Sequence, residues 1–395
     1  MNHVADRINK LEIPKTIAMT KMARELRAQG KDVISLSLGE PDFDTPDYIK
    51  AAAQKGMEEN YTHYMPVKGY ADLREVISKK FKRDNGLDYS PDQIVVSTGA
   101  KQSISNIILS LVNNGDEVII PAPYWVSYYE QTKLAGGKQV IVKTDYQNNF
   151  KITPEQLRNA MTSKTKLMIF STPNNPSGAM YSQEELDALA EVICEKEDFY
   201  VVCDEIYELI NYTGKKASLA KNPKVYEQVI TVNGLSKGFA MTGWRLGYIG
   251  APRWIADACD KIQSQFTSGA SSISQRAAMA ALGESPEKVQ YMVDTFRERR
   301  DLLAEKLNAI DGFEVKIPEG AFYVFPYVQE IIDNSELKDD SELAEYILKN
   351  ALVASVPGSA FGLPGYIRFS YAAKTEELEE AASRVRACIE QLLAK

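Results

Sequence analysis

Between residues 93 and 250, short apolar runs alternate with longer segments of helical character. The apolar runs occupy residues 93–97, 118–121, 139–143, 167–171, 200–203, 229–232 and 246–250. Runs of this length without polar alternation are typical of strands that are buried on both faces. A succession of strands and helices predicts a mainly parallel sheet with helices on both sides. We therefore expect an α/β architecture for this part of the chain.

The regions on either side of this alternation have a different pattern. Upstream, we expect helical pieces within 5–30, a strand at 33–38, and helices at 46–59 and 71–84. Downstream, we expect helices at 252–265, 274–282, 286–310, 340–349 and 376–393. Strands are expected in the same downstream region at 313–316, 321–325, 353–356 and 366–371. The long charged helix at 286–310 reads as the bridge between two domains. We predict an N-terminal segment (1–45) that packs with the small domain, a large domain (46–285) and a smaller α+β domain (286–395).

The bulk composition narrows the possible classes of protein. The chain has 395 residues, of which 44% are hydrophobic and 25% charged, with a net charge of −8. This acidic balance disfavours nucleic acid or an anionic membrane as the main partner. The four cysteines show no C-x-x-C spacing, and the two histidines are too few for a zinc site or a Ser-His-Asp enzyme. These counts favour a protein without a metal. No signal peptide or membrane-spanning run is visible, so we expect a cytoplasmic protein.

One lysine stands in surroundings that are unusual for a solvated side chain. Lys237 follows an apolar run and is flanked by Phe239, Met241 and Trp244. Keeping a lysine charged in an apolar loop is costly, and the usual reason is chemistry by the neutral amine, either Schiff-base formation or base catalysis. Arg245, eight residues further on, provides an anion-binding fork suited to phosphate.

Other short polar stretches fall where predicted strands end, which is where open α/β sheets bind ligands. They are T-G-A-K at 98–101, P-Y-W at 123–125, P-N-N-P-S-G at 173–178, D-E-I-Y at 204–207 and, in the second domain, R-F-S at 368–370. A glycine at the start of a helix leaves backbone N–H groups free for an anion. Each stretch alone is consistent with an ordinary turn, but together they indicate one ligand site.

These stretches, with G-E-P-D-F-D-T-P at 39–46 and S-K-G-F-A-M-T-G-W-R-L-G-Y at 236–248, resemble the class I aminotransferases. These are fold type I enzymes that use pyridoxal 5′-phosphate, and the chain is most similar to the bacterial aspartate aminotransferase subgroup. The resemblance implies a large domain with a mainly parallel seven-stranded sheet and a smaller α+β domain. It also implies transfer of an α-amino group between an amino acid and a 2-oxo acid, with aspartate and 2-oxoglutarate as the leading pair.

The resemblance assigns roles around the cofactor ring to five residues. Lys237 would hold the cofactor covalently and then move the substrate proton. Asp204 would pair with the ring nitrogen and keep it protonated. Tyr207 and Asn175 would hydrogen-bond the phenolic oxygen, and Trp125 would stack on the ring.

The phosphate would be held by Ser236, Arg245 and the turn at Gly99, Ala100 and Lys101. By the same resemblance, Tyr64 would reach the phosphate of the neighbouring subunit, which implies a homodimer with shared sites.

On the substrate side, the resemblance assigns the α-carboxylate to Arg368, helped by Asn175 and the Gly39 backbone, beside Trp125. Lys101 would bind the second carboxylate of a dicarboxylic substrate, with Lys15 as a helper. The N-terminal stretch I-P-K-T is one residue shorter than the corresponding stretch of aspartate-specific relatives, and Arg276 stands where such relatives often have an apolar residue.

These departures leave the substrate open, so prephenate, aromatic and alanine aminotransferases remain alternatives. A nicotinamide-dependent oxidoreductase is a more distant alternative, because no G-x-G-x-x-G follows the first strand of the alternating region. A regulatory protein that kept the fold would need a DNA-binding segment, and neither spare length nor a basic patch is present.

Overall fold

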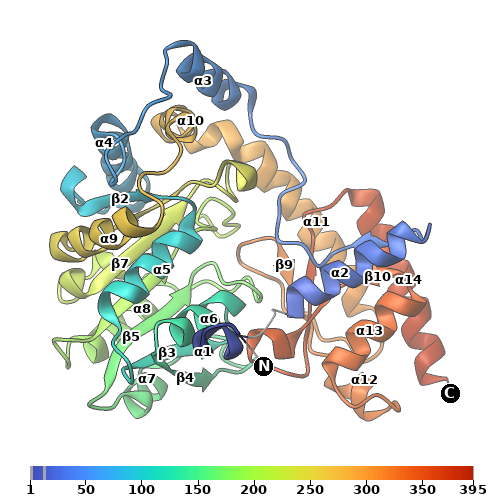
Figure 1. The fold of residues 1–395 in the computed structure, drawn as a ribbon. Helices are drawn as coiled ribbons and strands as arrows, with labels where there is room; N and C mark the ends of the chain where they lie inside the picture. Colours follow the sequence, from blue (N-terminus) through green and yellow to red (C-terminus); the bar gives the residue numbers. More distant parts are fainter. Residues whose placement is uncertain (1–2, 12–14, 395) are drawn as a thin grey trace.

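A seven-stranded sheet forms the centre of the molecule in the computed structural model, which describes residues 3–11 and 15–394 (Figure 1). Its strands are β2 (Ile94–Ser97), β3 (Glu117–Ala122), β4 (Lys138–Lys143), β5 (Thr165–Ser171), β6 (Tyr200–Asp204), β7 (Val229–Gly234) and β8 (Gly247–Gly250). They lie in the order β2-β8-β7-β6-β5-β3-β4. The five strands from β7 to β4 are parallel, whereas β8 runs antiparallel to β7 and β2. The predicted mainly parallel sheet is confirmed.

Helices cover both faces of this sheet, as continuous apolar strands require. One face packs against α5 (Ala100–Leu111), α6 (Val126–Leu134) and α9 (Arg253–Phe266). The other face packs against α4 (Ala71–Lys80), α8 (Gln183–Ile193) and α10 (Ser272–Gly283). Alternate residues of each strand enter the two cores; in β2, Val95 joins the first and Val96 the second. The edge strand β4 is only partly buried. Two further helices of this region are α3 (Asp47–Glu58) and α7 (Pro154–Ala160).

A second group of elements lies beyond α11 (Gln290–Asn308), which passes between the two parts in Figure 1. It contains the antiparallel sheet β11-β12-β9 and, around it, α12 (Gln329–Asp333), α13 (Asp340–Asn350) and α14 (Thr375–Leu393). The sheet strands are β9 (Tyr323–Val324), β11 (Val356–Pro357) and β12 (Ile367–Ser370). The predicted domain boundaries near residues 45 and 285 stay predictions.

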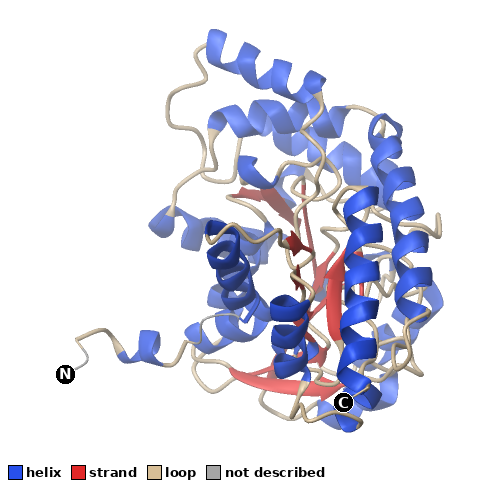
Figure 2. Ribbon diagram, turned by 90° about the vertical axis from the view of Figure 1, so that its right-hand side faces the viewer, coloured by secondary structure: helices blue, strands red, loops and turns tan. Residues whose placement is uncertain are grey.

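The N-terminal segment joins this second group through a short parallel pair, β1 (Ile34–Ser35) with β10 (Val353–Ala354). Helix α2 (Lys15–Ala28) also contacts β10 and β11. By contrast, α1 (Asp6–Asn9) buries no residue and extends away from the body of the molecule in Figure 2. Within the part of the chain that is described, no helix is both long and apolar enough to cross a membrane.

The strand expected at 33–38 is confined to Ile34–Ser35, and three other predicted elements differ in type or pairing. The helix expected at 71–84 changes to a π-helix at Phe81–Asn85, which ends at Gly86 with φ +68°. The strand expected at 313–316 is only a bridge between Glu314 and Tyr327. The strand expected at 353–356 is two short strands, because residues 353–354 pair with β1 and residues 356–357 pair with β12. Sequence patterns do not reveal such a change of pairing partner.

Candidate active site

A pocket of about 710 Å³ lies at the carboxyl ends of β5, β6 and β7, where these strands face β9, β12 and residues 37–39. This is the edge at which parallel sheets bind ligands. Its lining is strongly basic. Among the described residues, six cationic side chains contribute to it, namely Lys21, Arg24, Lys101, Lys237, Arg245 and Arg368, against the single carboxylate of Asp204. Such a pocket suits a ligand that carries several negative charges.

Lys237 lies in the turn after β7, and its side chain is half-buried. Its Nζ donates a hydrogen bond of 2.5 Å to the Gly39 carbonyl and lies 5.9 Å from the ring centres of Tyr207 and Phe322. Burial, and then repulsion from nearby arginines, lowers the pKa of Lys237 to about 8, although Glu40 opposes this shift. The neutral, nucleophilic amine is therefore far more populated than in a solvated lysine.

Asp204 ends β6 and is only 3% exposed. Tyr128 donates a hydrogen bond of 2.6 Å to its carboxylate, and the Ile206 backbone N–H donates another of 3.2 Å. Burial raises the pKa of Asp204 to about 6, although Tyr128, Ile206 and Lys237 oppose this shift, and no described residue forms an ion pair with the carboxylate. A ligand with a protonated ring nitrogen would supply the missing positive charge. Tyr128 was not predicted from the sequence, where it is one of several aromatic residues of a helix.

Arg368, on β12, is buried and has donors to spare. Its guanidinium donates to Asn175 Oδ1 at 2.9 Å and to the Ser37 carbonyl at 2.6 Å, while its Nε has no hydrogen-bond partner among the described residues. The guanidinium also stacks on the ring of Tyr323, with its carbon 4.4 Å from the ring centre. A planar guanidinium held in this way fits a carboxylate from the pocket side.

Tyr323 is a further residue that the sequence did not reveal. Its hydroxyl lies 2.8 Å from the hydroxyl of Tyr207, and both side chains are buried. A Cβ atom at Gly39 would collide with the Tyr323 hydroxyl, so the close approach of the 37–39 segment requires glycine there. Tyr207 and Tyr323 thus form one wall between Lys237 and Arg368.

An anion site faces the other end of the pocket, at the start of α5. Gly99 precedes this helix with φ +83°, and a Cβ atom there would lie 2.6 Å from Arg245 Nη2. Gly247 likewise leaves room for the backbone of Ala100, and Ser236 lies on the same wall. Free N–H groups of a helix start together with a guanidinium are a typical phosphate site.

Lys101 and Trp125 define the side of the pocket between these sites. Lys101 Nζ lies 4.9 Å from the Trp125 ring centre, and burial together with Arg245 lowers the pKa of Lys101. At the mouth of the pocket, α2 contributes Lys21 and Arg24. The sequence did not single out these two residues, because charged residues on a helix are usually solvated.

Two candidates lie away from this pocket. Tyr64 is 98% exposed and does not line it. Arg276 is also absent from the lining; it pairs with Asp72 through two hydrogen bonds of 2.7 and 2.8 Å and stacks on two tyrosines. The side chain of Lys15 lies outside the described residues, so its role as a helper is not placed.

A buried lysine with a lowered pKa, a buried carboxylate that forms no ion pair with any described residue, and a helix start beside an arginine are together suited to pyridoxal 5′-phosphate. When bound, the cofactor supplies a carbonyl that takes up the amino group and a ring that accepts electrons. Lys237 would hold it, Asp204 would face its ring nitrogen, and Arg245 with the start of α5 would bind its phosphate.

Comparisons with known proteins agree with this description. The family model "Aminotransferase class I and II" matches residues 31–385. An aspartate aminotransferase of Bacillus subtilis is 45% identical, covering 98% of this chain and 99% of that protein. A probable aspartate/prephenate aminotransferase of Rhizobium leguminosarum bv. phaseoli is 44% identical, with 98% of both chains covered. The aspartate aminotransferase of Rhizobium meliloti has a crystal structure with a TM-score of 0.96 at 40% identity, covering 99% of this chain and 100% of that one.

The chain therefore belongs to the class I and II aminotransferases. It is a pyridoxal 5′-phosphate-dependent aminotransferase of fold type I, as the sequence motifs predicted.

Proposed function

We propose that this enzyme exchanges amino groups between aspartate and 2-oxoglutarate. The observation that carries the proposal is Lys101. Its ammonium lies on the pocket wall over Trp125, and within residues 3–11 and 15–394 no carboxylate is paired with it. Arg368 can bind only one carboxylate of a substrate. A second carboxylate in the pocket would be costly without a cation of its own, and Lys101 supplies one.

Both partners of a transamination must use the same pocket in turn. Aspartate and 2-oxoglutarate each carry two carboxylates, so one pair of cations, Arg368 and Lys101, serves both. The relatives support this reading, since those of Bacillus subtilis and Geobacillus stearothermophilus are aspartate aminotransferases.

We expect Lys101→Ala to lower kcat/KM for aspartate and glutamate about 30-fold, while alanine and phenylalanine are almost unaffected, because only dicarboxylates lose an ionic contact worth roughly 2 kcal/mol. Steady-state kinetics with these four amino acids would measure the effect. Lys133→Ala is the matched control, because Lys133 also lies over an aromatic ring, that of Tyr129 at 5.6 Å, but does not line the pocket.

The dicarboxylate proposal fails if the wild-type enzyme prefers phenylalanine or alanine, or if Lys101→Ala weakens all four substrates equally. An aromatic or alanine aminotransferase would then be the better description.

Prephenate is a second candidate amino-group acceptor. Lys21 and Arg24 place two further cations at the mouth of the pocket, beyond the two that aspartate requires. Prephenate is a larger 2-oxo acid whose second carboxylate is carried by its ring, so it would extend toward that mouth. Several relatives are named for both substrates, including one of Nitrosomonas europaea. The same assay with prephenate in place of 2-oxoglutarate would test this activity.

We also propose a homodimer whose subunits share their active sites, and a location in the cytoplasm. Tyr64 supports the dimer, because a tyrosine that is 98% exposed in one chain is suited to a partner surface. Helix α1, which buries no residue and extends away from the body of the molecule in Figure 2, is likewise suited to a partner surface. The cytoplasmic location is supported by four free cysteines, three of them buried.

Hybrid dimers would test whether the sites are shared. Lys237→Ala and Tyr64→Ala subunits should each form impaired homodimers. If Tyr64 serves the partner's site, a mixed dimer contains one site with both defects and one site with neither. Mixing the two variants under subunit exchange should therefore restore activity to at least about one quarter of the wild-type value. A mixture of Lys237→Ala with Lys133→Ala subunits is the control, because it shows whether the exchange procedure itself changes the activity.

Restoration no greater than the sum of the separate variants would show that Tyr64 does not act across subunits. An active monomer in sedimentation analysis would contradict the dimer as a whole.

A further inference from the structure

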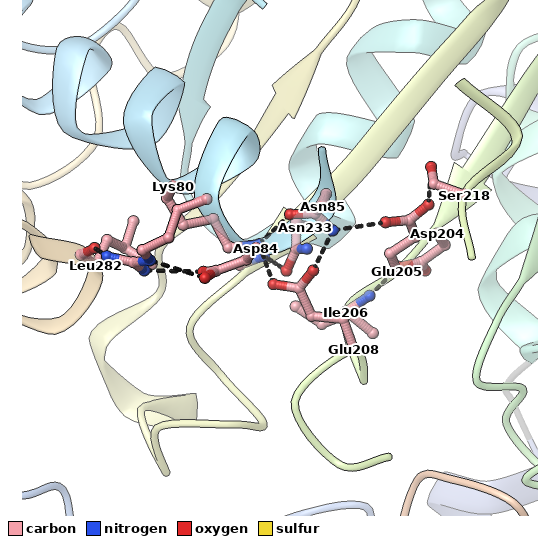
Figure 3. Close-up of polar contacts among 12 residues, drawn as sticks. Lys80, Asp84, Asn85, Asp204, Glu205, Ile206, Glu208, Ser218, Asn233 and Leu282 are labelled. Carbon is pink, nitrogen blue, oxygen red and sulfur yellow. Dashed lines mark hydrogen bonds and ion pairs between the residues drawn. The ribbon is translucent and has the colours of Figure 1, made fainter. Parts of the chain in front are cut away.

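A buried polar network lies directly behind Asp204, on the opposite face of β6. Glu205 continues the strand, because its N–H donates to the Val232 carbonyl at 2.8 Å. Successive side chains of a strand point to opposite faces. Asp204 accordingly lines the main pocket, whereas Glu205 lines a small separate cavity of about 40 Å³. On this opposite face of β6 lies a set of hydrogen-bonded polar residues, here called the Glu205 network. It consists of Lys80, Asn85, Glu205, Glu208 and Ser218 (Figure 3).

Three segments that are distant in sequence meet in the Glu205 network. Ser218 Oγ donates to Glu205 at 2.6 Å, and Asn85 Nδ2 donates to Glu205 at 3.3 Å and to Glu208 at 2.6 Å. Lys80 Nζ donates to Asn85 Oδ1 at 2.8 Å and to Glu208. Glu205 itself is only 2% exposed. The network therefore fixes the chain immediately after Asp204 to two other parts of the fold.

The π-helix at Phe81–Asn85 makes this arrangement possible. Lys80 and Asn85 are five residues apart, a spacing that an α-helix would place on different faces. In the structure their side chains touch and both point toward Glu208 (Figure 3). π-helical turns are energetically unfavourable and occur frequently at functional sites. Here the turn delivers the amide that contacts Glu205.

Among the described residues, no cation forms an ion pair with Glu205. Lys80 pairs with Glu208, and Arg83 pairs with Asp84 through two bonds of 2.8 Å. In the part of the chain that the structure describes, the Glu205 carboxyl receives hydrogen bonds from a hydroxyl, an amide and, at 3.6 Å, the Cys203 thiol. A buried carboxylate without a cation is costly, so the uncharged acid is favoured.

The remaining ionisable groups near Glu205 do not change this balance. Burial raises the pKa of Cys203, Tyr89 and Tyr248 well above their ordinary values, so these groups are neutral. Burial, with a contribution from Glu208, raises the pKa of Glu205 to about 7, although Ser218 and Lys80 oppose this shift.

We propose that Glu205 is a positioning residue, an uncharged acid that is held by Ser218 and Asn85 and fixes the end of β6, and thereby the direction of the Asp204 carboxylate. The inference concerns the cofactor side of the pocket and does not depend on which amino acid is the substrate.

Three variants test this proposal. Glu205→Gln keeps the shape and an uncharged group, whereas Glu205→Ala removes the link. Tyr89→Phe is the matched control, because the Tyr89 hydroxyl forms a buried hydrogen bond of 3.0 Å to Thr231 and not to Glu205, and Tyr89 does not line the main pocket. The readouts are the Kd of pyridoxal 5′-phosphate for the apoprotein, the absorbance of the bound cofactor as a function of pH, and thermal unfolding of the apoprotein at several pH values.

We expect Glu205→Gln to bind the cofactor within about twofold of wild type, and Glu205→Ala to bind it about tenfold more weakly, on the scale of one lost buried hydrogen bond. Glu205→Ala should also shift the pH at which the absorbance of the bound cofactor changes, whereas Tyr89→Phe should lower only the Tm. In the wild-type apoprotein, ionisation of Glu205 destabilises the fold as pH rises from about 4.5 to about 7. Glu205→Gln should therefore have a higher Tm than wild type above pH 7, with the gain absent below pH 4.5.

Two results would overturn the proposal. If Glu205→Ala keeps the wild-type Kd and absorbance profile, Glu205 has a structural role only. If Glu205→Gln is impaired as much as Glu205→Ala, the charged form is required. Should Glu205→Ala fail to fold, Ser218→Ala removes one of the two anchoring contacts, and the same readouts then decide between these outcomes. No amino-acid substrate enters these measurements, so their failure is distinct from failure of the aspartate proposal.

Discussion

Replacing Lys237 with alanine is expected to abolish transamination, with a loss of at least about 10⁴-fold, and to prevent covalent attachment of the cofactor. The size of the effect follows from the site. Lys237 is the pocket amine with a pKa lowered to about 8, and it lies between the Asp204 side and the Arg368 side of the pocket. One residue would thus supply both the nucleophile and the group that moves the substrate proton.

Reduction with borohydride followed by peptide mapping would measure the attachment directly. In the wild-type enzyme the cofactor should be fixed to Lys237 alone. Lys101→Ala is the matched control, since it removes another amine of the same pocket and should leave the labelling of Lys237 intact. Cofactor that is reduced onto a different lysine would refute the assignment of the whole site.

Asp204→Asn is expected to leave cofactor binding largely intact and to lower kcat by roughly 10²–10³, the scale of removing one preorganised charged group. Asparagine keeps the shape of the side chain but cannot stabilise a protonated ring nitrogen, and that protonation makes the ring an electron acceptor. Steady-state kinetics with the absorbance spectrum of the bound cofactor would measure both effects. A near-normal kcat would show that the carboxylate lacks this role.

Tyr128→Phe provides a graded comparison, because it removes the 2.6 Å hydrogen bond to Asp204 and keeps the charge. Its kcat should fall by about tenfold or less.

Although Asp204→Asn should lower kcat, it should raise the stability of the apoprotein at high pH. The pKa of Asp204 is raised to about 6, so its ionisation destabilises the folded apoprotein increasingly from about pH 4 and fully above pH 6. Asp204→Asn should therefore gain stability relative to wild type at pH 8 but not at pH 4.

The large sheet could be predicted from the sequence because its strands are buried on both faces and read as unbroken apolar runs. The π-helix at Phe81–Asn85 could not be predicted. Its residues carry helical character, and the shift in hydrogen bonding depends on where Lys80 and Asn85 meet Glu208. Local pattern describes burial well, but it does not describe a partner that is more than 100 residues away.

The same limit applies to the site. Lys237 and Arg368 stand in short stretches of sequence that resemble the class I aminotransferases, so each could be recognised from its own stretch. Tyr128 and Tyr323 stand in no such stretch, and their partners Asp204 and Tyr207 lie 76 and 116 residues away. Only the topology of the sheet brings these pairs together.

The segment at residues 37–39 binds its two cationic partners through main-chain carbonyls, with Ser37 facing Arg368 and Gly39 facing Lys237. Every residue type offers the same carbonyl, so the identity of the side chain at positions 37 and 38 matters little for these contacts. What matters is the spacing along the chain, together with the absence of a side chain at Gly39. Over evolutionary time this stretch should accept substitutions at Leu38 yet reject insertions and deletions, since a gain or loss of one residue would move both carbonyls away from their cations at once.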